Sequence, residues 1–319
     1  MSWRSTTVVT LMVLSSSHCT SAPPADQARR TIKVTTGMAG ASFQPLGTGL
    51  VEVFARRIPD VDFAAVETAG SVSNLEALQS GEADVGLAYA DVAYMAYTGL
   101  LPDDRRPFRE LRAVAVLHVS PVHVLVRSDS RIKSIAELRG RRVGIGPPGS
   151  GTALTSTLLL EAFDVPLDST QQHSLPFTDA ADGLTRGDLD AVVVVSADPV
   201  ESVQRAIDGG ARLLDIDSPT VTRLRDNYPF LRPALIPERT YQGLPDTVHT
   251  VGIDTLLVGR AGVSDTLATE ITRAFFEALP ELGSRLESFL FVDPDRAPAT
   301  PIPLHAGAAR YYRERELFR

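Results

Sequence analysis

The chain has 319 residues, of which 44% are hydrophobic and 22% are charged, as in an ordinary globular protein. At ~150 residues per domain, this length predicts about two domains. The formal net charge of −8 and the aromatic content of 6% argue against a nucleic-acid binder and against a protein that attaches to membranes through a basic surface. The single cysteine, Cys19, excludes an intramolecular disulfide and a thiolate metal cluster.

The N-terminus is typical of a secretory signal. Residues 1–22 contain Arg4, a short apolar run at 8–14 and then small residues. The apolar run is too short to span a bilayer. We therefore expect export, with a signal peptide at 1–22 and a tether at 23–30. Cys19 is a candidate for lipidation after cleavage, although His18 is a poor fit to the small residue expected before such a cysteine. The alternative is an N-terminal segment without function.

After the tether, the sequence alternates between short strands and helices. Strands are expected at 31–36, 63–66 and 84–89, with one helix from Pro45 and another from Ser71 to a left-handed cap at Gly81. This alternation predicts parallel strands in a sheet that helices cover on both faces.

A quasi-repeat indicates that this unit occurs twice. Residues 78–85 read Leu-Gln-Ser-Gly-Glu-Ala-Asp-Val, and residues 184–191 read Leu-Thr-Arg-Gly-Asp-Leu-Asp-Ala, 106 positions later. Both segments end a helix, turn through glycine and enter an apolar strand. Chance similarity of two turns is one interpretation, and two lobes of related architecture is the other.

Two long β-branched stretches, 111–126 and 248–258, can join the two lobes. If the chain leaves the first lobe through one stretch and returns through the other, the lobes can move about these connections. A helix from Ser264 to Leu279, capped by Ser264, would then complete the first lobe. The predicted organisation is a signal peptide at 1–22, a tether at 23–30, lobe one at 31–117, lobe two at 118–250 and the completion of lobe one at 251–319.

Three candidate catalytic motifs fail on inspection. Residues 144–149 match a dinucleotide-binding glycine pattern, but Pro147 and Pro148 stand where its helix would begin. The same turn resembles a phosphate-binding loop, but Thr152 occupies the place of the essential lysine. Ser150 lacks the flanking glycines of a nucleophile elbow.

The histidines and carboxylates likewise suggest no chemistry. His118 and His123 are five residues apart, so in one strand they point to opposite faces and cannot share a metal ion. No acid–base pair can be nominated among the acidic residues. We therefore expect no catalytic residue, no metal and no cofactor.

Three turns rich in glycine and hydroxyl residues remain as candidate binding elements: 37–43, 70–74 and 149–152. Each is expected to precede a helix, where free backbone N–H groups and the helix dipole favour an anion. Ligands of such sheets bind outside the carboxyl ends of the strands, where these turns lie. The alternative is that Ser71, Ser150 and Thr152 only cap their own helices.

The sequence also resembles the TAXI family, the extracytoplasmic solute receptors of tripartite ATP-independent periplasmic (TRAP) transporters. The resemblance covers nearly the whole mature chain, in order. It rests on the turns at 34–47, 70–75 and 146–152, on Gly81-Glu-Ala-Asp84 with Asp91 after the strand, and on the segments 236–241 and 303–312.

This resemblance implies a two-lobed periplasmic-binding-protein fold of class II, with a hinge of two crossing strands. It implies capture of a small organic anion, often an amino acid such as glutamate, and delivery to a TRAP-type membrane permease driven by an ion gradient. We expect a monomer. The ligand-binding residues carried over to this chain are Gly37, Ala39, Gly40, Ser42, Phe43, Gly70, Ser71, Asn74, Tyr89, Asp91, Gly149, Ser150, Gly151 and Thr152.

Two residues depart from the family's pattern. The family commonly has tyrosine in place of Phe43 and a glutamine-like residue near Tyr89. These changes alter which polar groups of a ligand can be satisfied, so glutamate itself is not assigned.

Two other functions stay open. A ligand-binding sensor module would have the same cleft and a membrane signalling partner, and neighbouring genes would distinguish it from a transport receptor. An enzyme on this fold would turn over candidate acids, which incubation and product analysis would detect.

Overall fold

The computed structural model describes residues 1, 3, 29–226 and 228–316. Most of the predicted signal peptide, including Cys19, and most of the tether lie outside these residues. No helix in the described ranges combines the length and the apolar character needed to cross a bilayer.

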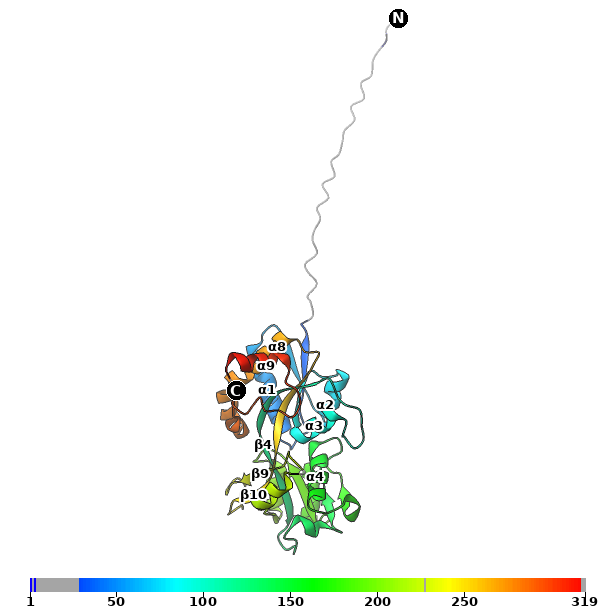
Figure 1. Ribbon diagram of the computed structural model, residues 1–319, viewed down its shortest axis with the longest axis vertical. Coiled ribbons are helices and arrows are strands. Elements are labelled where there is room, and N and C mark those ends of the chain that lie inside the picture. Colours follow the sequence, from blue (N-terminus) through cyan, green and yellow to red (C-terminus); the bar gives the residue numbers. More distant parts are fainter. Residues whose placement is uncertain (2, 4–28, 227, 317–319) are drawn as a thin grey trace.

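Two long strands run between two lobes (Figure 1). They are β4 (Leu111–Arg127) and β10 (Val248–Arg260), which pair antiparallel from Leu111 with Arg260 to Pro121 with Gly252. Beyond this pairing, β4 continues into the second lobe and pairs with β7, whereas β10 pairs with β9. The two stretches predicted to join the lobes are therefore both strands, and their pairing forms the connection.

The first lobe contains the strand order β2-β1-β3-β10-β4. Its parallel strands are β1 (Thr31–Thr35), β2 (Asp62–Val66) and β3 (Val85–Tyr89). Its helices are α1 (Phe43–Arg57), α2 (Ser71–Ser80), α3 (Ala90–Thr98), α8 (Asp265–Arg285), η3 (Glu287–Phe291) and α9 (Ala306–Glu314).

The second lobe continues the same sheet path through β7, β5 and β6. Its strands are β5 (Arg142–Gly144), β6 (Gln171–His173), β7 (Ala191–Val195), β8 (Ala211–Leu213) and β9 (Arg232–Ile236). Its helices are η1 (Ile135–Leu138), α4 (Gly151–Ala162), η2 (Leu167–Ser169), α5 (Phe177–Arg186), α6 (Glu201–Asp208) and α7 (Ser218–Leu224).

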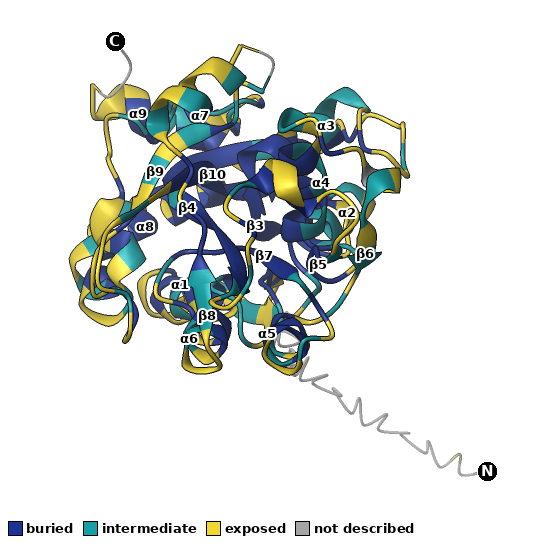
Figure 2. Ribbon diagram, turned by 90° about the horizontal axis from the view of Figure 1, so that it is seen from below, coloured by how far each residue is buried: buried dark blue, intermediate teal, exposed yellow. Residues whose placement is uncertain are grey.

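The connecting strands lie in the core rather than on the surface. Figure 2 shows β4, β7 and β10 almost entirely buried beneath the helices. The strand β7 is one alanine followed by four valines, and β4 is rich in valine and leucine, as expected of strands covered on both faces. This α/β arrangement is the predicted two-lobed architecture. The exact lobe boundaries at residues 118 and 250 stay a prediction.

The quasi-repeat is confirmed as a structural repeat. The helices α2 and α5 both end at a glycine in the left-handed conformation, Gly81 with φ of 82° and Gly187 with φ of 80°. Each turn leads into a fully buried five-residue strand, β3 or β7. The two lobes therefore share the helix–turn–strand unit that the sequence indicated.

Two predicted helix boundaries are wrong. The helix α1 begins at Phe43 instead of Pro45, and α8 continues to Arg285 although Leu279 was the expected end. Pro280 lies inside α8 and has no N–H to donate, which normally weakens a helix. Beyond it, Leu282 is fully buried, and this packing holds the last turns of the helix in place.

Candidate functional site

Five helices begin at one small cavity between the lobes. The first residues of α1, α2, α4 and α5 line it, and so does Tyr89, the N-cap of α3. The cavity has a volume of about 20 Å³, enough for one water molecule. A ligand of several heavy atoms therefore needs the lobes to separate before it can enter. The lining residues are Gly37, Met38, Ala41, Phe43, Ala69, Gly70, Ser71, Tyr89, Ser150, Gly151, Thr152, Phe177 and Val195.

The cavity wall is electrically neutral in its side chains but positive in its backbone. None of the lining residues is charged. Each helix start carries a partial positive charge, about half an elementary charge. The backbone amides of Ser71 and Val72 in α2, and of Gly151 and Thr152 in α4, donate to no acceptor in the described part of the chain. Such amides favour an anion.

The starts of α2 and α4 meet across the cleft at glycines. A Cβ atom at Gly151 would lie 2.5 Å from the Ser71 hydroxyl oxygen and 2.4 Å from the Tyr89 ring. The backbone amide of Ser73 donates to the carbonyl of Gly149 at 3.1 Å, so the two lobes also share a backbone hydrogen bond. Only a residue without a side chain allows this approach.

Further hydrogen bonds join the lobes around the cavity. The Tyr89 hydroxyl donates to the carbonyl of Val195 at 2.7 Å. The backbone amide of Ser42 donates to the Ser196 hydroxyl at 3.2 Å, and the amide of Ala197 donates to the Ser42 hydroxyl at 3.2 Å. The structure is therefore the closed arrangement of the two lobes.

Asp91 forms a buried contact between the lobes. Its carboxylate accepts a hydrogen bond from the Thr155 hydroxyl of α4 at 2.7 Å and another from the backbone amide of Val92 at 2.8 Å. Burial raises the pKa of Asp91 to about 6, and the two hydrogen bonds lower it only in part. The closed arrangement therefore makes Asp91 a weaker acid than an exposed aspartate, although the carboxyl group stays mostly ionised at neutral pH.

The predicted site residues divide into two groups. Eight line the cavity: Gly37, Phe43, Gly70, Ser71, Tyr89, Ser150, Gly151 and Thr152. Six lie outside its wall: Ala39, Gly40, Ser42, Asn74, Asp91 and Gly149. Two further wall residues, Met38 and Ala41, lie within the predicted turn 37–43 but were not named, and Ala69, Phe177 and Val195 lie outside the predicted turns. Tyr89 is hydrogen-bonded to Val195, which lies 106 positions later. The offset of the quasi-repeat therefore pointed to Val195 as the counterpart of the predicted residue Tyr89.

The polar side chains of these turns differ in whether they still have a hydrogen-bonding group free for a ligand. Ser150 accepts the amide of Ala153 and donates to the carbonyl of Pro147, so it caps α4. The Asn74 amide group donates to two backbone carbonyls, and its oxygen accepts from the Thr68 hydroxyl. Thr152 exchanges two bonds with the backbone of Val195.

Ser71 is different. Its hydroxyl oxygen accepts the amide of Tyr89 at 3.1 Å, and no described residue accepts its proton. Among the four polar side chains considered, Ser71 is therefore the one that can still donate a hydrogen bond to a ligand.

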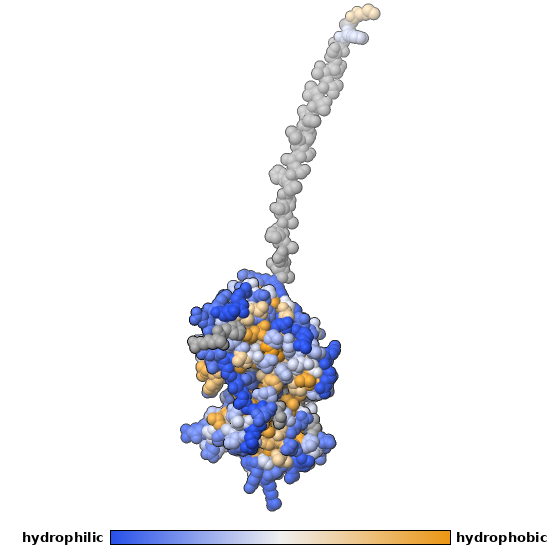
Figure 3. All heavy atoms as spheres, in the orientation of Figure 1, coloured by the Kyte–Doolittle hydropathy of each residue, from blue (hydrophilic) through white to orange (hydrophobic). Residues whose placement is uncertain are grey.

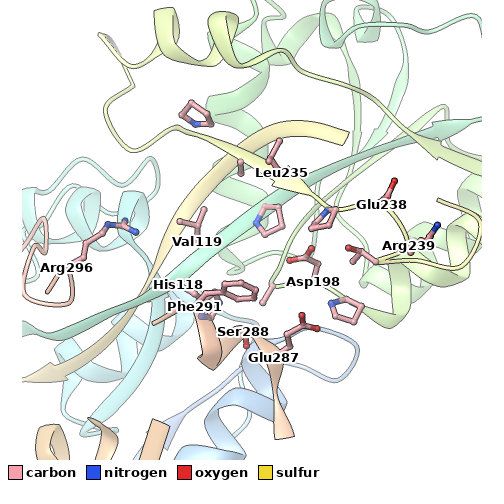
Figure 4. Close-up of a pocket in the computed structure, with 17 residues that line it drawn as sticks. His118, Val119, Asp198, Leu235, Glu238, Arg239, Glu287, Ser288, Phe291 and Arg296 are labelled. Carbon is pink, nitrogen blue, oxygen red and sulfur yellow. The ribbon is translucent and has the colours of Figure 1, made fainter. Parts of the chain in front are cut away.

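A second, larger cavity lies beside the connecting strands (Figure 4). Its volume is about 600 Å³, and its walls come from β4, β9, η3 and the loop after β7. Ser42 contacts Ser196 and Ala197, which directly follow β7. Val195, the last residue of β7, lines the small cavity, and Ala197 lines the larger one. None of the predicted site residues lines the larger cavity.

The histidines of β4 carry no charge at neutral pH. His118 and His123 are buried, and burial lowers the pKa of each to about 4. Within the described ranges, no group of three or more histidine, cysteine, aspartate or glutamate residues could hold a metal ion.

Several solved structures are similar to the chain over most of its length. They include the periplasmic binding protein BugD, with 14% identity, a TM-score of 0.57, and coverage of 89% of this chain and 94% of that one. PhnD1 from Prochlorococcus marinus in complex with methylphosphonate has 12% identity and a TM-score of 0.54, and the match covers 90% of this chain and 97% of that one. The alkanesulfonate-binding protein SsuA from Xanthomonas axonopodis pv. citri, bound to MOPS, has 16% identity and a TM-score of 0.52, with 94% and 96% covered.

These similarities show the fold, the two-lobed fold of periplasmic binding proteins. The similarity to a family is more specific. A family model matches residues 34–315, which include both lobes and their connections. The chain belongs to the NMT1-like family.

Proposed function

We propose that this protein is an extracytoplasmic solute-binding protein that captures a small organic anion, of the carboxylate or amino-acid type, between its lobes. The observation that carries the proposal is the convergence of five helix starts on one interlobe cavity. Their partial positive charges add at the place where lobe closure excludes water, and a lower dielectric strengthens each interaction with an anion.

The donors we assign to the ligand are mostly backbone groups. Four amides at the starts of α2 and α4, together with the Ser71 hydroxyl, can surround a carboxylate from both lobes. A carboxylate bound in this way needs no cationic partner, because several charge-assisted hydrogen bonds replace its hydration. The remaining predicted residues would form the wall and keep these donors in position.

The partner we propose is a TRAP-type secondary permease, on the strength of the resemblance to the TAXI family. The proposal includes export through the N-terminal signal, binding as a monomer and closure about the connections near residues 118 and 250. A solute receptor of this kind releases its ligand to the permease when the lobes open, since closure and binding stabilise each other.

The ligand can be identified from the protein itself. Small molecules released by denaturing purified protein, analysed by mass spectrometry, should include an organic acid in near-stoichiometric amount. Recovery of a neutral or cationic compound in its place would contradict the anion proposal.

Ser71→Ala should then lower the affinity for that acid by about ten- to a hundredfold, the usual loss for a hydrogen bond to a charged group. The matched control is Ser150→Ala, which removes a cap and should lower the free energy of unfolding by about 1 kcal/mol with little change in affinity. Calorimetric titration and thermal melts of both variants provide these two values. Equal affinity in wild type and Ser71→Ala would remove Ser71 from the site.

The transport partner needs a separate test. Uptake of the labelled acid by cells that contain the protein should stop when the ion gradient is collapsed and continue when ATP is depleted with the gradient maintained. Dependence on ATP alone would point to an ABC-type transporter, and uptake that is unchanged without the protein would favour a sensor role.

A further inference from the structure

The larger cavity beside the connecting strands has the size and the walls of a small-molecule site. Its volume of about 600 Å³ lies within the usual range for ligand pockets, ~300–1,000 Å³. More than half of its lining is apolar, including Val119, Leu235 and Phe291. Leu235 and Phe291 are 54% and 68% exposed, and both lie in the wall of this one cavity, where grouped apolar side chains indicate an interaction site. Figure 3 shows apolar residues at the surface on both sides of the waist between the lobes.

Two carboxylates face the middle of this cavity from opposite lobes. Asp198 lies in the loop after β7, and Glu287 is the first residue of η3 (Figure 4). Burial and the negative charge of Glu287 raise the pKa of Asp198, and no cationic side chain in the described residues lowers it. Figure 4 shows both carboxylates at the centre of the cavity, where the negative charge of Glu287 acts on Asp198.

The cations around the cavity do not neutralise this pair. Arg296 is bonded to Asp254, and the side chain of Arg239 extends away from the centre of the cavity (Figure 4). His118 also lines the cavity, but it is neutral at neutral pH because burial lowers its pKa to about 4. The centre of the cavity is consequently negative, whereas the wall of the small cavity is neutral and faces helix starts.

The loop that carries Asp198 is fixed in place. The Tyr241 hydroxyl accepts the backbone amide of Val200 at 3.3 Å and bonds to the His123 ring nitrogen at 2.8 Å. Tyr241 is fully buried, and its ring contacts that of His123 edge to face. Asp198 therefore projects from a loop anchored to β4, as a preorganised binding group requires.

We propose that this hinge-side cavity is a second ligand site, which binds a small organic ammonium ion with an apolar body. The ammonium N–H groups would donate to Asp198 and Glu287, and the apolar body would lie against Val119, Leu235 and Phe291. Because the two carboxylates belong to different lobes, the bound cation would also join the lobes at this edge. This site is independent of the anion site in the small cavity.

The test compares three probes of similar shape and different charge: 2-phenylethylammonium, 2-phenylethanol and 3-phenylpropanoate. Each is titrated into the purified protein by calorimetry at low and at high salt. The ammonium probe should bind with a Kd below about 1 mM, and the other two at least about tenfold more weakly. Equal affinities for the three probes, or no binding of the ammonium probe at about 10 mM, would overturn the proposal.

Single substitutions test whether the ammonium probe binds in the hinge-side cavity. Asp198→Asn should weaken binding of 2-phenylethylammonium by about ten- to a hundredfold, and Glu287→Gln, which is more exposed, by about two- to fivefold. Asp60→Asn removes the same charge at an exposed position in the first lobe, away from the cavity, and should leave the affinity unchanged. Glu287 lies on the surface, so Glu287→Gln decides the question if Asp198→Asn does not fold. Unchanged affinity in Glu287→Gln and in folded Asp198→Asn, or equal losses in all three variants, would refute the assignment.

Discussion

Each lobe has an aspartate at the start of an inner strand whose carboxylate accepts a backbone amide of the neighbouring strand. The cations that surround the two carboxylates differ. In the first lobe, the carboxylate of Asp84 accepts the backbone amide of Lys33 at 3.1 Å. In the second lobe, the carboxylate of Asp190 accepts the backbone amide of Arg142 at 2.9 Å. Each aspartate also donates its own amide to the carbonyl of the same partner residue. An aspartate after the glycine turn thus joins two adjacent parallel strands in both lobes.

The difference lies in the cations that surround each carboxylate. Asp84 is bonded to Arg260 at the end of β10 and to Arg30 before β1, and its side chain is 11% exposed. Asp190 is paired only with the Arg142 guanidinium among the described residues, and its side chain is 27% exposed. In the first lobe, Asp84 therefore also bonds to the end of β10, the strand that returns from the second lobe.

The largest effect that tests this comparison is the loss of the more buried carboxylate. Asp84→Asn should lower the free energy of unfolding by about 3 kcal/mol, because it leaves Arg260 without its partner. Asp190→Asn should cost less than half as much, since its ion pair is more exposed to solvent. Urea unfolding of the two variants and the wild type measures both values. Equal losses would mean that the additional arginines add nothing to the first lobe.

The next effect is a dependence of stability on pH that a carboxyl group of the first lobe contributes and the second lobe lacks. Asp91 follows β3, and the residue 106 positions later is Ala197, so the second lobe has no equivalent carboxyl group. The folded-state pKa of Asp91 is raised from 3.8 to about 6 by burial, so the folded protein holds this proton more tightly than the unfolded chain. The contribution of Asp91 to stability is therefore greatest below about pH 4 and falls as the pH rises to about 6, by roughly 3 kcal/mol in all.

The measurement is the free energy of unfolding from pH 4 to pH 8 for the wild type and Asp91→Asn. The difference between the two curves isolates the contribution of Asp91, because the other titrating groups are shared. The variant should gain relative to the wild type as the pH rises through this window and stay level above it. Parallel curves would mean that the carboxyl group is not buried in solution.

The first lobe was more predictable than the interface between the lobes. Its first three strands and the helix α2 follow from local signals: β-branched runs, and a glycine that ends the helix in the left-handed conformation. Such signals act within a few residues, so they survive in the sequence alone. The extent of α8 beyond Pro280 depends on packing against distant residues, and local rules ended this helix too early.

The turns before the helix starts could be located for the same reason, whereas the hydrogen-bond partners of their side chains could not, and their role in binding stays a prediction. Glycine and hydroxyl residues before a helix indicate a helix start, and eight of the named residues do line the cavity. Phe177, Val195 and the hinge-side cavity depend on how one lobe sits against the other. That arrangement is set by tertiary packing, which has no periodic signature in the sequence.

The helix starts offer a second comparison, since the Ser71 hydroxyl accepts the Tyr89 amide just as Thr152 accepts the Val195 amide. Gly151→Ala should break the contact between these two units, because its Cβ atom would overlap Ser71 and Tyr89 of the other lobe. Overpacking of this kind costs about 1–3 kcal/mol, so ligand affinity should fall by about five- to 150-fold through loss of the closed state.

The matched control is Gly49→Ala in α1, where the added Cβ would make an ordinary contact of 3.5 Å with Leu282. This change should keep the affinity and leave the stability equal or slightly higher. Titration of the ligand and small-angle scattering with and without it measure affinity and closure. Normal closure in Gly151→Ala would show that the lobes meet less closely in solution.

The smallest effect concerns the two glycine turns of the repeat, and it tests whether the lobes are equivalent at the backbone level. Gly81 and Gly187 both have φ near 80°, which an alanine adopts at a cost of about 1–2 kcal/mol. A Cβ atom at Gly81 would meet nothing within 4 Å, whereas one at Gly187 would lie 2.5 Å from the end of the flexible Arg127 side chain. The Arg127 side chain is 42% exposed and can move aside, so Gly81→Ala and Gly187→Ala should destabilise the protein nearly equally. Thermal melts that place one variant far below the other would show that the turns differ in more than their immediate surroundings, and a neutral Gly81→Ala would contradict the left-handed geometry itself.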